Sequence, residues 1–229
     1  MGEKKNFTET DMVNLLDKLY DQVLNGIPKV SKSVEEFSND YMSKNSSSQE
    51  AVKDMIKNQI LKCTTSGFIT GFGGLITLPI AVPANIGSVL YVQMRMIASA
   101  AYISGCDVHC DQVQSLIYAC LAGVSVNKFI KDAGIRFGNK FAQNLINKIP
   151  GKVCYEINRR VGFRFVTKAG EKGILNLGKI VPGVGAVVSG GLDFFETKLI
   201  ANRAYVWFVE NDFSDESKSK VIDVEYTEA

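Results

Sequence analysis

The chain has 229 residues, which is enough for one domain of ordinary size. Charged residues make up 22% and hydrophobic residues 46%, the balance of a protein with a packed core. This composition excludes a mostly disordered chain and a small disulfide-stapled domain. The cysteine count is odd and the N-terminus lacks the apolar core of a signal peptide, so we expect a cytoplasmic protein with reduced thiols.

The first segment, residues 1–47, predicts amphipathic helices. Apolar residues recur at three- and four-residue steps from Met12 to Leu24, and Thr8 or Thr10 can cap the start of this helix. Gly26 ends it. A capping box pairs Ser or Thr with Glu three residues later. Two such patterns predict the starts of the next two helices, Ser33-x-x-Glu36 and Ser47-x-x-Glu50.

An uncharged stretch of 32 residues follows, from Cys63 to Met94. Prolines limit its first apolar segment to 67–78, which is too short to cross a bilayer. The next segment, 84–104, is long enough but has Arg95 near its centre, where a lone charge is costly in lipid. We therefore predict an apolar hairpin, either buried in protein or re-entrant in a membrane. Its marker residues are Gly67, Gly71, Gly73, Gly74, Pro79 and Pro83.

Charge is distributed unevenly along the chain. Residues 128–179 contain twelve Lys or Arg and three acidic residues, whereas residues 180–229 contain four and nine. Cations interleaved with aromatic rings are typical of helices at an anionic membrane surface. Single-stranded nucleic acid attracts the same residue types, but no nucleic-acid-binding motif accompanies them, so nucleic acid is an unlikely partner. A solvated helical face balanced by the acidic tail is the simpler alternative. The predicted membrane-facing residues are Lys140, Lys148, Lys152, Arg159, Arg160, Phe163, Arg164, Phe165, Lys168 and Lys172.

The later segments keep the helical period. Asp111 and Gln114 predict a capping-box-like start for an apolar helix. The basic block predicts amphipathic helices that are interrupted at Pro150-Gly151. A long helix is predicted over 182–209, followed by an acidic, disordered tail over 210–229.

A weak internal repeat relates the two glycine-rich apolar units, about 67–105 and 170–209. A shift of 103 residues aligns them with six identities in 24 compared positions, including Pro79 with Pro182. Compositional coincidence is the alternative explanation. The sequence thus predicts an all-α fold, with one compact helical domain over 48–209 built around these two units.

Polar residues within the apolar helices indicate a second candidate site. A buried charge requires a partner or a shifted pKa. We therefore predict that Arg95 pairs with Asp193 or Glu196 across the two units, with Thr197 beside them. This cluster is either an ion pair that fixes helix register or a polar spot lining an apolar cavity that holds a ligand headgroup.

Motifs for catalysis are absent from the sequence. It contains no Gly-x-Ser-x-Gly elbow, no P-loop and no His-Glu-x-x-His motif. The segment Cys106-Asp107-Val108-His109-Cys110 suggests zinc, but a tetrahedral site would need a distant fourth ligand. Packed apolar cysteines are the simpler interpretation. We therefore predict no catalytic residue, no cofactor and no metal site.

Several blocks occur in a characteristic order and spacing: Gly67–Pro79, Gln93-Met94-Arg95, Ser104–Asp107, Ile157–Phe163, Lys168–Gly173, Gly178–Pro182, and Gly191-Leu192-Asp193 with Thr197. Over about residues 50–209, the chain resembles the EcsC family of bacterial proteins. That family takes its name from a gene beside those of an ABC exporter. The resemblance implies a membrane-linked setting, with an ABC transporter or another membrane protein as partner, and it implies no catalytic residue.

The leading functional hypothesis is a non-enzymatic, membrane-associated accessory protein. It would dock peripherally on the inner leaflet through its basic helical face and the apolar hairpin. One alternative is a hydrolase-like enzyme for a lipid or peptide, with Arg95, Asp193 and Glu196 in its pocket. Another is a binder of a hydrophobic ligand in a cavity near Arg95.

Overall fold

The computed structural model describes residues 8–64, 84–135, 143–168 and 191–213. Every named element within these ranges is a helix, and the only β-pairing there is an isolated bridge between Ile27 and Ser31. The predicted all-α fold is therefore confirmed. The hairpin residues Gly67 to Pro83 and the lead-in of the second unit, 170–190, lie outside the described residues.

Three capped helices form the N-terminal part of the fold. Helix α1 (Glu9–Asn25) begins after Thr8, whose hydroxyl accepts a hydrogen bond from the Asp11 amide at 3.1 Å. It ends at Gly26, where φ is +77° and a Cβ atom would lie 2.6 Å from the Ser31 carbonyl. The two predicted capping patterns precede α2 (Val34–Met42) and α3 (Ser48–Thr64). Local sequence therefore sets these helix starts.

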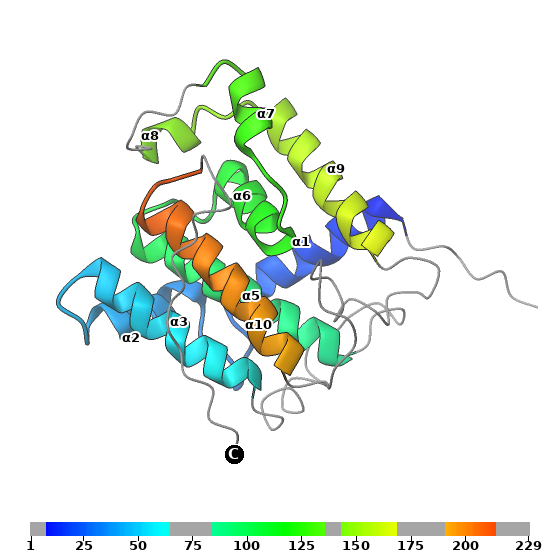
Figure 1. Ribbon diagram of the computed structural model, residues 1–229. Helices are drawn as coiled ribbons and strands as arrows, with labels where there is room; N and C mark the ends of the chain where they lie inside the picture. Colours follow the sequence, from blue (N-terminus) through cyan, green and yellow to red (C-terminus); the bar gives the residue numbers. More distant parts are fainter. Residues whose placement is uncertain (1–7, 65–83, 136–142, 169–190, 214–229) are drawn as a thin grey trace, which may run out of the picture.

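Helix α5 (Ala84–Ile103) is the centre of the core. It packs against α1, α2, α3, α6 and α10 (Gly191–Ala204), and Figure 1 shows α10 crossing it. Every residue from Leu90 to Ala101 is buried. A helix enclosed on all sides needs apolar residues around its whole circumference, which explains why this stretch lacks an amphipathic pattern.

Helix α6 (Asp111–Ala122) corrects one prediction. Its N-cap is Cys110, which makes no side-chain capping bond. The Gln114 amide instead donates to the Asp17 carboxylate at 3.0 Å and to the Tyr118 hydroxyl at 2.7 Å. The side chain that seemed to cap α6 therefore joins α6 to α1.

In its described residues, the basic block contains two short helices and one long one. These are α7 (Asn127–Asp132), α8 (Gln143–Ile146) and α9 (Gly151–Lys168), which starts after Pro150 as predicted. Helix α9 packs against α6 and α1. At Gly162 a Cβ atom would lie 2.7 Å from the Glu9 carbonyl oxygen, so this glycine allows α9 to approach the start of α1.

The last described segment closes the core. Helix α10 continues into a π-helical turn, η3 (Tyr205–Val209). The chain then packs back on itself, because the Phe213 ring lies 5.2 Å from that of Trp207 and is 4% exposed. The packed chain thus extends four residues, 210–213, into the segment predicted as a tail. Among the described helices, none is long and apolar enough to cross a membrane.

Candidate docking face and the buried arginine

Helix α9 has one buried and one exposed face. The buried face packs on α1 and α6 through Val153, Cys154, Ile157, Val161 and Phe165. The opposite face exposes Lys152, Tyr155, Arg159, Arg160 and Phe163, and we call these five residues the docking face. In Figure 1, α9 lies along the upper right of the molecule, and α2 and α3 lie at the lower left.

The docking face combines cations with large rings. Tyr155 is 69% exposed and Phe163 is 42% exposed, although rings of this size usually enter the core. Helical spacing places Lys152, Tyr155, Arg159 and Phe163 on one stripe. The Arg160 guanidinium lies 5.4 Å from the centre of the Phe163 ring, within cation–π distance. The face therefore offers aromatic surface and positive charge to the same partner.

The other residues predicted to face a membrane are dispersed. Lys148 is exposed just before α9, and Arg164 is partly buried. Phe165 is 3% exposed and belongs to the core face of α9, which corrects the grouping made from sequence. Lys140, Lys172 and the side chain of Lys168 lie outside the described residues.

Arg95 is buried, with 4% of its surface exposed, and several elements contribute to its surroundings. Its Nη1 donates to the Ser31 hydroxyl at 2.5 Å, and its Nη2 donates to the Gln59 side-chain oxygen at 2.9 Å. The guanidinium lies 4.4 Å from the ring centre of Phe37 and 5.6 Å from that of Tyr91. Arg95 thereby joins α5 to α2, to α3 and to the turn after α1. The sequence did not indicate that Ser31, Gln59 and Phe37 would be neighbours of Arg95.

Thr197 takes part in a different contact. Its hydroxyl accepts a hydrogen bond from the Gln93 amide at 3.1 Å, and both side chains are buried. This bond ties α5 to α10. The predicted partners of Arg95, Asp193 and Glu196, lie on α10, but their side chains are outside the described residues. That ion pair stays a prediction.

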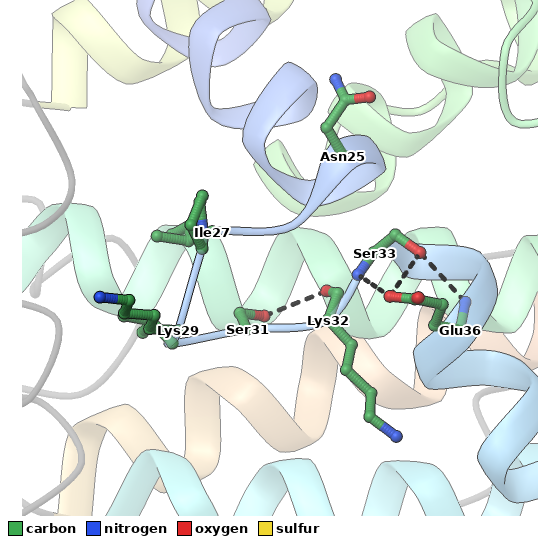
Figure 2. Close-up of a pocket in the computed structure, with 9 residues that line it drawn as sticks. Asn25, Ile27, Lys29, Ser31, Lys32, Ser33 and Glu36 are labelled. Atoms are coloured by element: carbon green, nitrogen blue, oxygen red, sulfur yellow. Dashed lines mark hydrogen bonds between the residues drawn. The ribbon is translucent and has the colours of Figure 1, made fainter.

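An open pocket of about 450 Å³ lies beside the turn that contains Ser31 (Figure 2). The same serine touches Arg95 on its inner side, so the pocket and the arginine cluster share one wall. The pocket is lined by Asn25, Ile27, Pro28, Lys29, Val30, Ser31, Lys32, Ser33 and Glu36. Sequence reasoning missed this pocket, because the capping box Ser33-x-x-Glu36 marks a helix start and does not show that the turn before it encloses a cavity.

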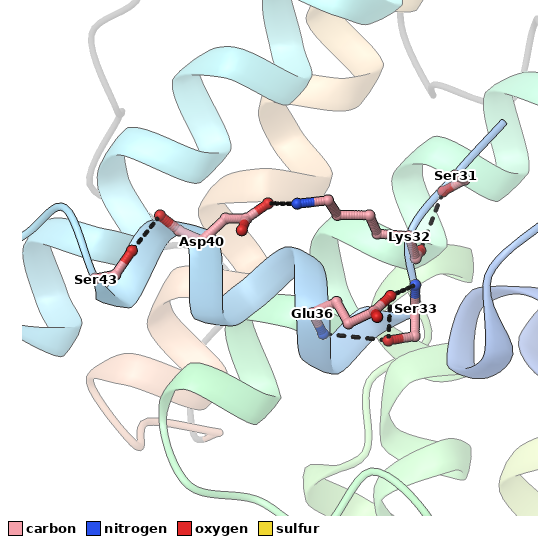
Figure 3. A network of polar contacts seen from close by, with 6 residues as sticks. All are labelled: Ser31, Lys32, Ser33, Glu36, Asp40 and Ser43. Atoms are coloured by element: carbon pink, nitrogen blue, oxygen red, sulfur yellow. Dashed lines mark hydrogen bonds and ion pairs between the residues drawn. The ribbon is translucent and has the colours of Figure 1, made fainter. Parts of the chain in front are cut away.

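Two charged residues at this pocket, Lys32 and Glu36, contact neighbouring residues (Figure 3). Lys32 pairs with Asp40, which raises the pKa of the lysine and lowers that of the aspartate. The Glu36 carboxylate accepts a hydrogen bond from the Ser33 amide at 3.2 Å, completing the capping box of α2. These contacts hold the start of α2 in place.

The cysteine-rich segment folds as a turn before α6. His109 lies 3.1 Å from the Glu35 carboxylate, and both side chains are exposed. Burial raises the pKa of Cys106 to about 11 and that of Cys120 to about 12, so both thiols stay protonated near neutral pH. Within the described residues, no three His, Cys, Asp or Glu side chains are grouped for a metal ion.

Comparison with known proteins identifies no relative of this chain. No family model matches the chain, and no curated protein or solved structure is similar to it. The resemblance to the EcsC family stays a prediction from the spacing of its motifs. The docking face is therefore the feature of the molecule that points to a function.

Proposed function

We propose that this chain is a non-enzymatic, peripheral membrane protein that docks on an anionic lipid surface through the outer face of α9. The observation that carries the proposal is the exposure of Tyr155 and Phe163 on the same helix face as Lys152, Arg159 and Arg160. Rings of this kind enter the boundary of the acyl chains, while cations meet the lipid phosphates.

The spacing of the face suits a flat surface. Tyr155 and Phe163 are eight residues apart, so they are about 12 Å apart along the helix axis. Arg159 lies between them, four residues from each. Both rings can therefore insert at once, with a cation held at phosphate depth between them.

The docking face is formed before any lipid arrives. Packing on α1 and α6 fixes the rotation of α9, so docking requires no unfolding of the helix. Lys128 and Lys131 are exposed on α7, which also packs against α9, and Lys148 is exposed just before α9. These side chains extend the positive potential beyond the face and attract an anionic surface from a distance.

The finer parts of the proposal depend on the sequence alone. Docking on the inner leaflet follows from the expected cytoplasmic location. A role beside an ABC exporter or another membrane protein follows from the EcsC resemblance. The predicted help from the 67–83 hairpin concerns residues outside the described part of the chain.

Co-sedimentation with vesicles tests the docking proposal. We expect the chain to bind vesicles that mix phosphatidylcholine with phosphatidylglycerol, and to bind pure phosphatidylcholine weakly. Replacing Lys152, Arg159 and Arg160 by Gln removes about 1 kcal/mol of attraction for each charge, so binding should fall roughly a hundredfold. High salt should weaken wild-type binding because it screens these charges.

A matched variant controls for the loss of net charge. Lys44, Lys53 and Lys57 are exposed on or near α3, on the side of the molecule away from α9 in Figure 1. Their replacement by Gln removes the same charge and should change binding far less. If the two triple variants lost vesicle binding equally, binding would depend on the net charge of the protein and not on the docking face. Absence of wild-type binding at low salt would overturn the proposal.

A further inference from the structure

Arg159 and Arg160 are neighbours on the docking face, but their surroundings differ. Both side chains are exposed, and among the described residues neither forms a salt bridge with a carboxylate. The Arg160 guanidinium lies 5.4 Å from the ring centre of Phe163, whereas no ring in the described part of the chain lies against Arg159 in this way. The two arginines carry the same charge, so this ring contact is what distinguishes them.

The backbone that carries Phe163 is fixed on both sides. The preceding residue, Gly162, packs against the start of α1, where a Cβ atom would lie 2.7 Å from the Glu9 carbonyl oxygen. The Thr167 hydroxyl donates a hydrogen bond to the Phe163 carbonyl at 2.7 Å in the last turn of α9. The helix therefore cannot rotate to bury the ring, which is 42% exposed. Only the rotamer of the ring is left to its side-chain neighbours.

The contact leaves Arg160 able to bind a second group. Residues three positions apart are neighbours on a helix surface, which allows the guanidinium to lie over the ring. A stacked guanidinium uses its flat face, and its N–H donors lie in its plane, where they remain available to oxygen acceptors. Arg160 can therefore hold the Phe163 ring and bind a phosphate oxygen at the same time.

We infer that Arg160 and Phe163 act as one unit in docking, in which the guanidinium binds a lipid phosphate and holds the ring beneath it among the acyl chains. The inference rests on the proposed docking function and divides its work among the cations. Lys152 and Arg159 attract the anionic surface through their charge alone. Arg160 is, in addition, the positioning residue for the inserted ring.

Salt dependence separates these two roles. At about 1 M salt the Debye length is only about 3 Å, so attraction by charge is screened while binding through an inserted ring persists. The full chain is co-sedimented with phosphatidylcholine–phosphatidylglycerol vesicles from low to high salt. Arg160→Lys keeps the charge, so the slope of binding against salt should not change. Because the compact ammonium stacks poorly, binding at high salt should weaken about two- to fivefold, the equivalent of an exposed cation–π contact. Arg159→Lys is the matched control and should change neither quantity.

A double-mutant cycle tests whether the two side chains act together. Phe163→Leu keeps an apolar side chain but removes the face on which Arg160 stacks. Combining it with Arg160→Lys should weaken high-salt binding no more than Phe163→Leu does alone, because both changes break the same contact. Tyr155 supplies the control ring, since it lies on the same face without a printed partner role for Arg160. The losses from Tyr155→Leu and Arg160→Lys should therefore multiply.

Different results overturn the unit and the docking proposal. Arg160→Lys that binds at high salt as wild type does, or losses from Arg160→Lys and Phe163→Leu that multiply, would overturn the unit and leave the docking proposal standing. Wild-type binding that disappears at high salt would overturn the inserted ring and leave attraction by charge. Absence of wild-type binding at low salt would overturn both. Equal urea midpoints check that each variant keeps the wild-type fold.

Discussion

Arginine serves two different purposes in two regions of this molecule. On α9, Arg159 and Arg160 point outward and are exposed. On α5, Arg95 is 4% exposed, and its guanidinium group donates hydrogen bonds to Ser31 and Gln59. A charge on the outer face is available to an external partner, whereas the buried charge is committed to holding helices together. The difference predicts that Arg95 affects stability and the outer arginines affect binding.

The strongest test of this contrast is Arg95→Met. Methionine fills a similar space but leaves the Ser31 hydroxyl and the Gln59 oxygen without their charged donor. Hydrogen bonds to charged groups are worth more than neutral ones, so we expect a loss of about 2–4 kcal/mol in the free energy of unfolding. Urea denaturation at neutral pH measures it.

Double-mutant cycles assign that loss to particular partners. Combining Arg95→Met with Gln59→Leu should give a total smaller than the sum of the single losses, because both changes break the same bond. The cycle with Asp193→Leu tests the ion pair predicted from sequence. Additive losses in the first cycle would remove Gln59 from the cluster, and additive losses in the second would remove Asp193.

Sequence predicted features that depend on neighbouring residues. The capping box at Ser33, the bond from the Glu50 amide to the Ser47 hydroxyl, and the burial of Arg95 in an uncharged helix follow from such short-range patterns. The bonds of Arg95 to Ser31 and Gln59 span 64 and 36 residues, and no local pattern encodes such pairs. The partners of Arg95 can therefore be identified only from the folded structure.

On the docking face, the sequence-based prediction failed for a different reason. Grouping by composition placed Phe163 and Phe165 together, but two residues along a helix turn the side chain by about 200°, to the far side. One ring is therefore exposed and the other buried. The regular four-residue spacing of Val153, Ile157, Val161 and Phe165 was a usable signal for the core face. A basic block thus has to be divided by helical phase before its exposed residues are known.

A second internal polar contact extends the comparison to pH. The Tyr118 hydroxyl donates to the Asp17 carboxylate at 2.8 Å, and burial raises the pKa of Asp17 while this bond lowers it. Because the folded-state pKa lies above the unfolded value, ionised Asp17 weakens the fold, and stability from this group rises as pH falls through that pKa. Tyr118→Phe removes the bond and raises the pKa further.

We therefore expect Tyr118→Phe to lose about 1–2 kcal/mol near neutral pH and less at acidic pH, where Asp17 is protonated. Urea denaturation at the two pH values measures the difference. Tyr102→Phe, which removes the hydroxyl of a partly buried tyrosine on α5, is the matched control. An equal loss at both pH values would mean that the hydroxyl does not stabilise the carboxylate.

The smallest expected effect on stability comes from Arg159→Gln on the docking face. An exposed side chain without a buried partner changes the free energy of unfolding by less than about 0.5 kcal/mol. The same change should lower binding to anionic vesicles roughly fivefold, since one charge near the surface contributes about 1 kcal/mol. Arg95→Met, assayed while folded, should leave vesicle binding close to wild type. If Arg159→Gln instead destabilised the fold and left binding intact, the outer arginine would serve the same purpose as the buried one, and the distinction between the two regions would fail.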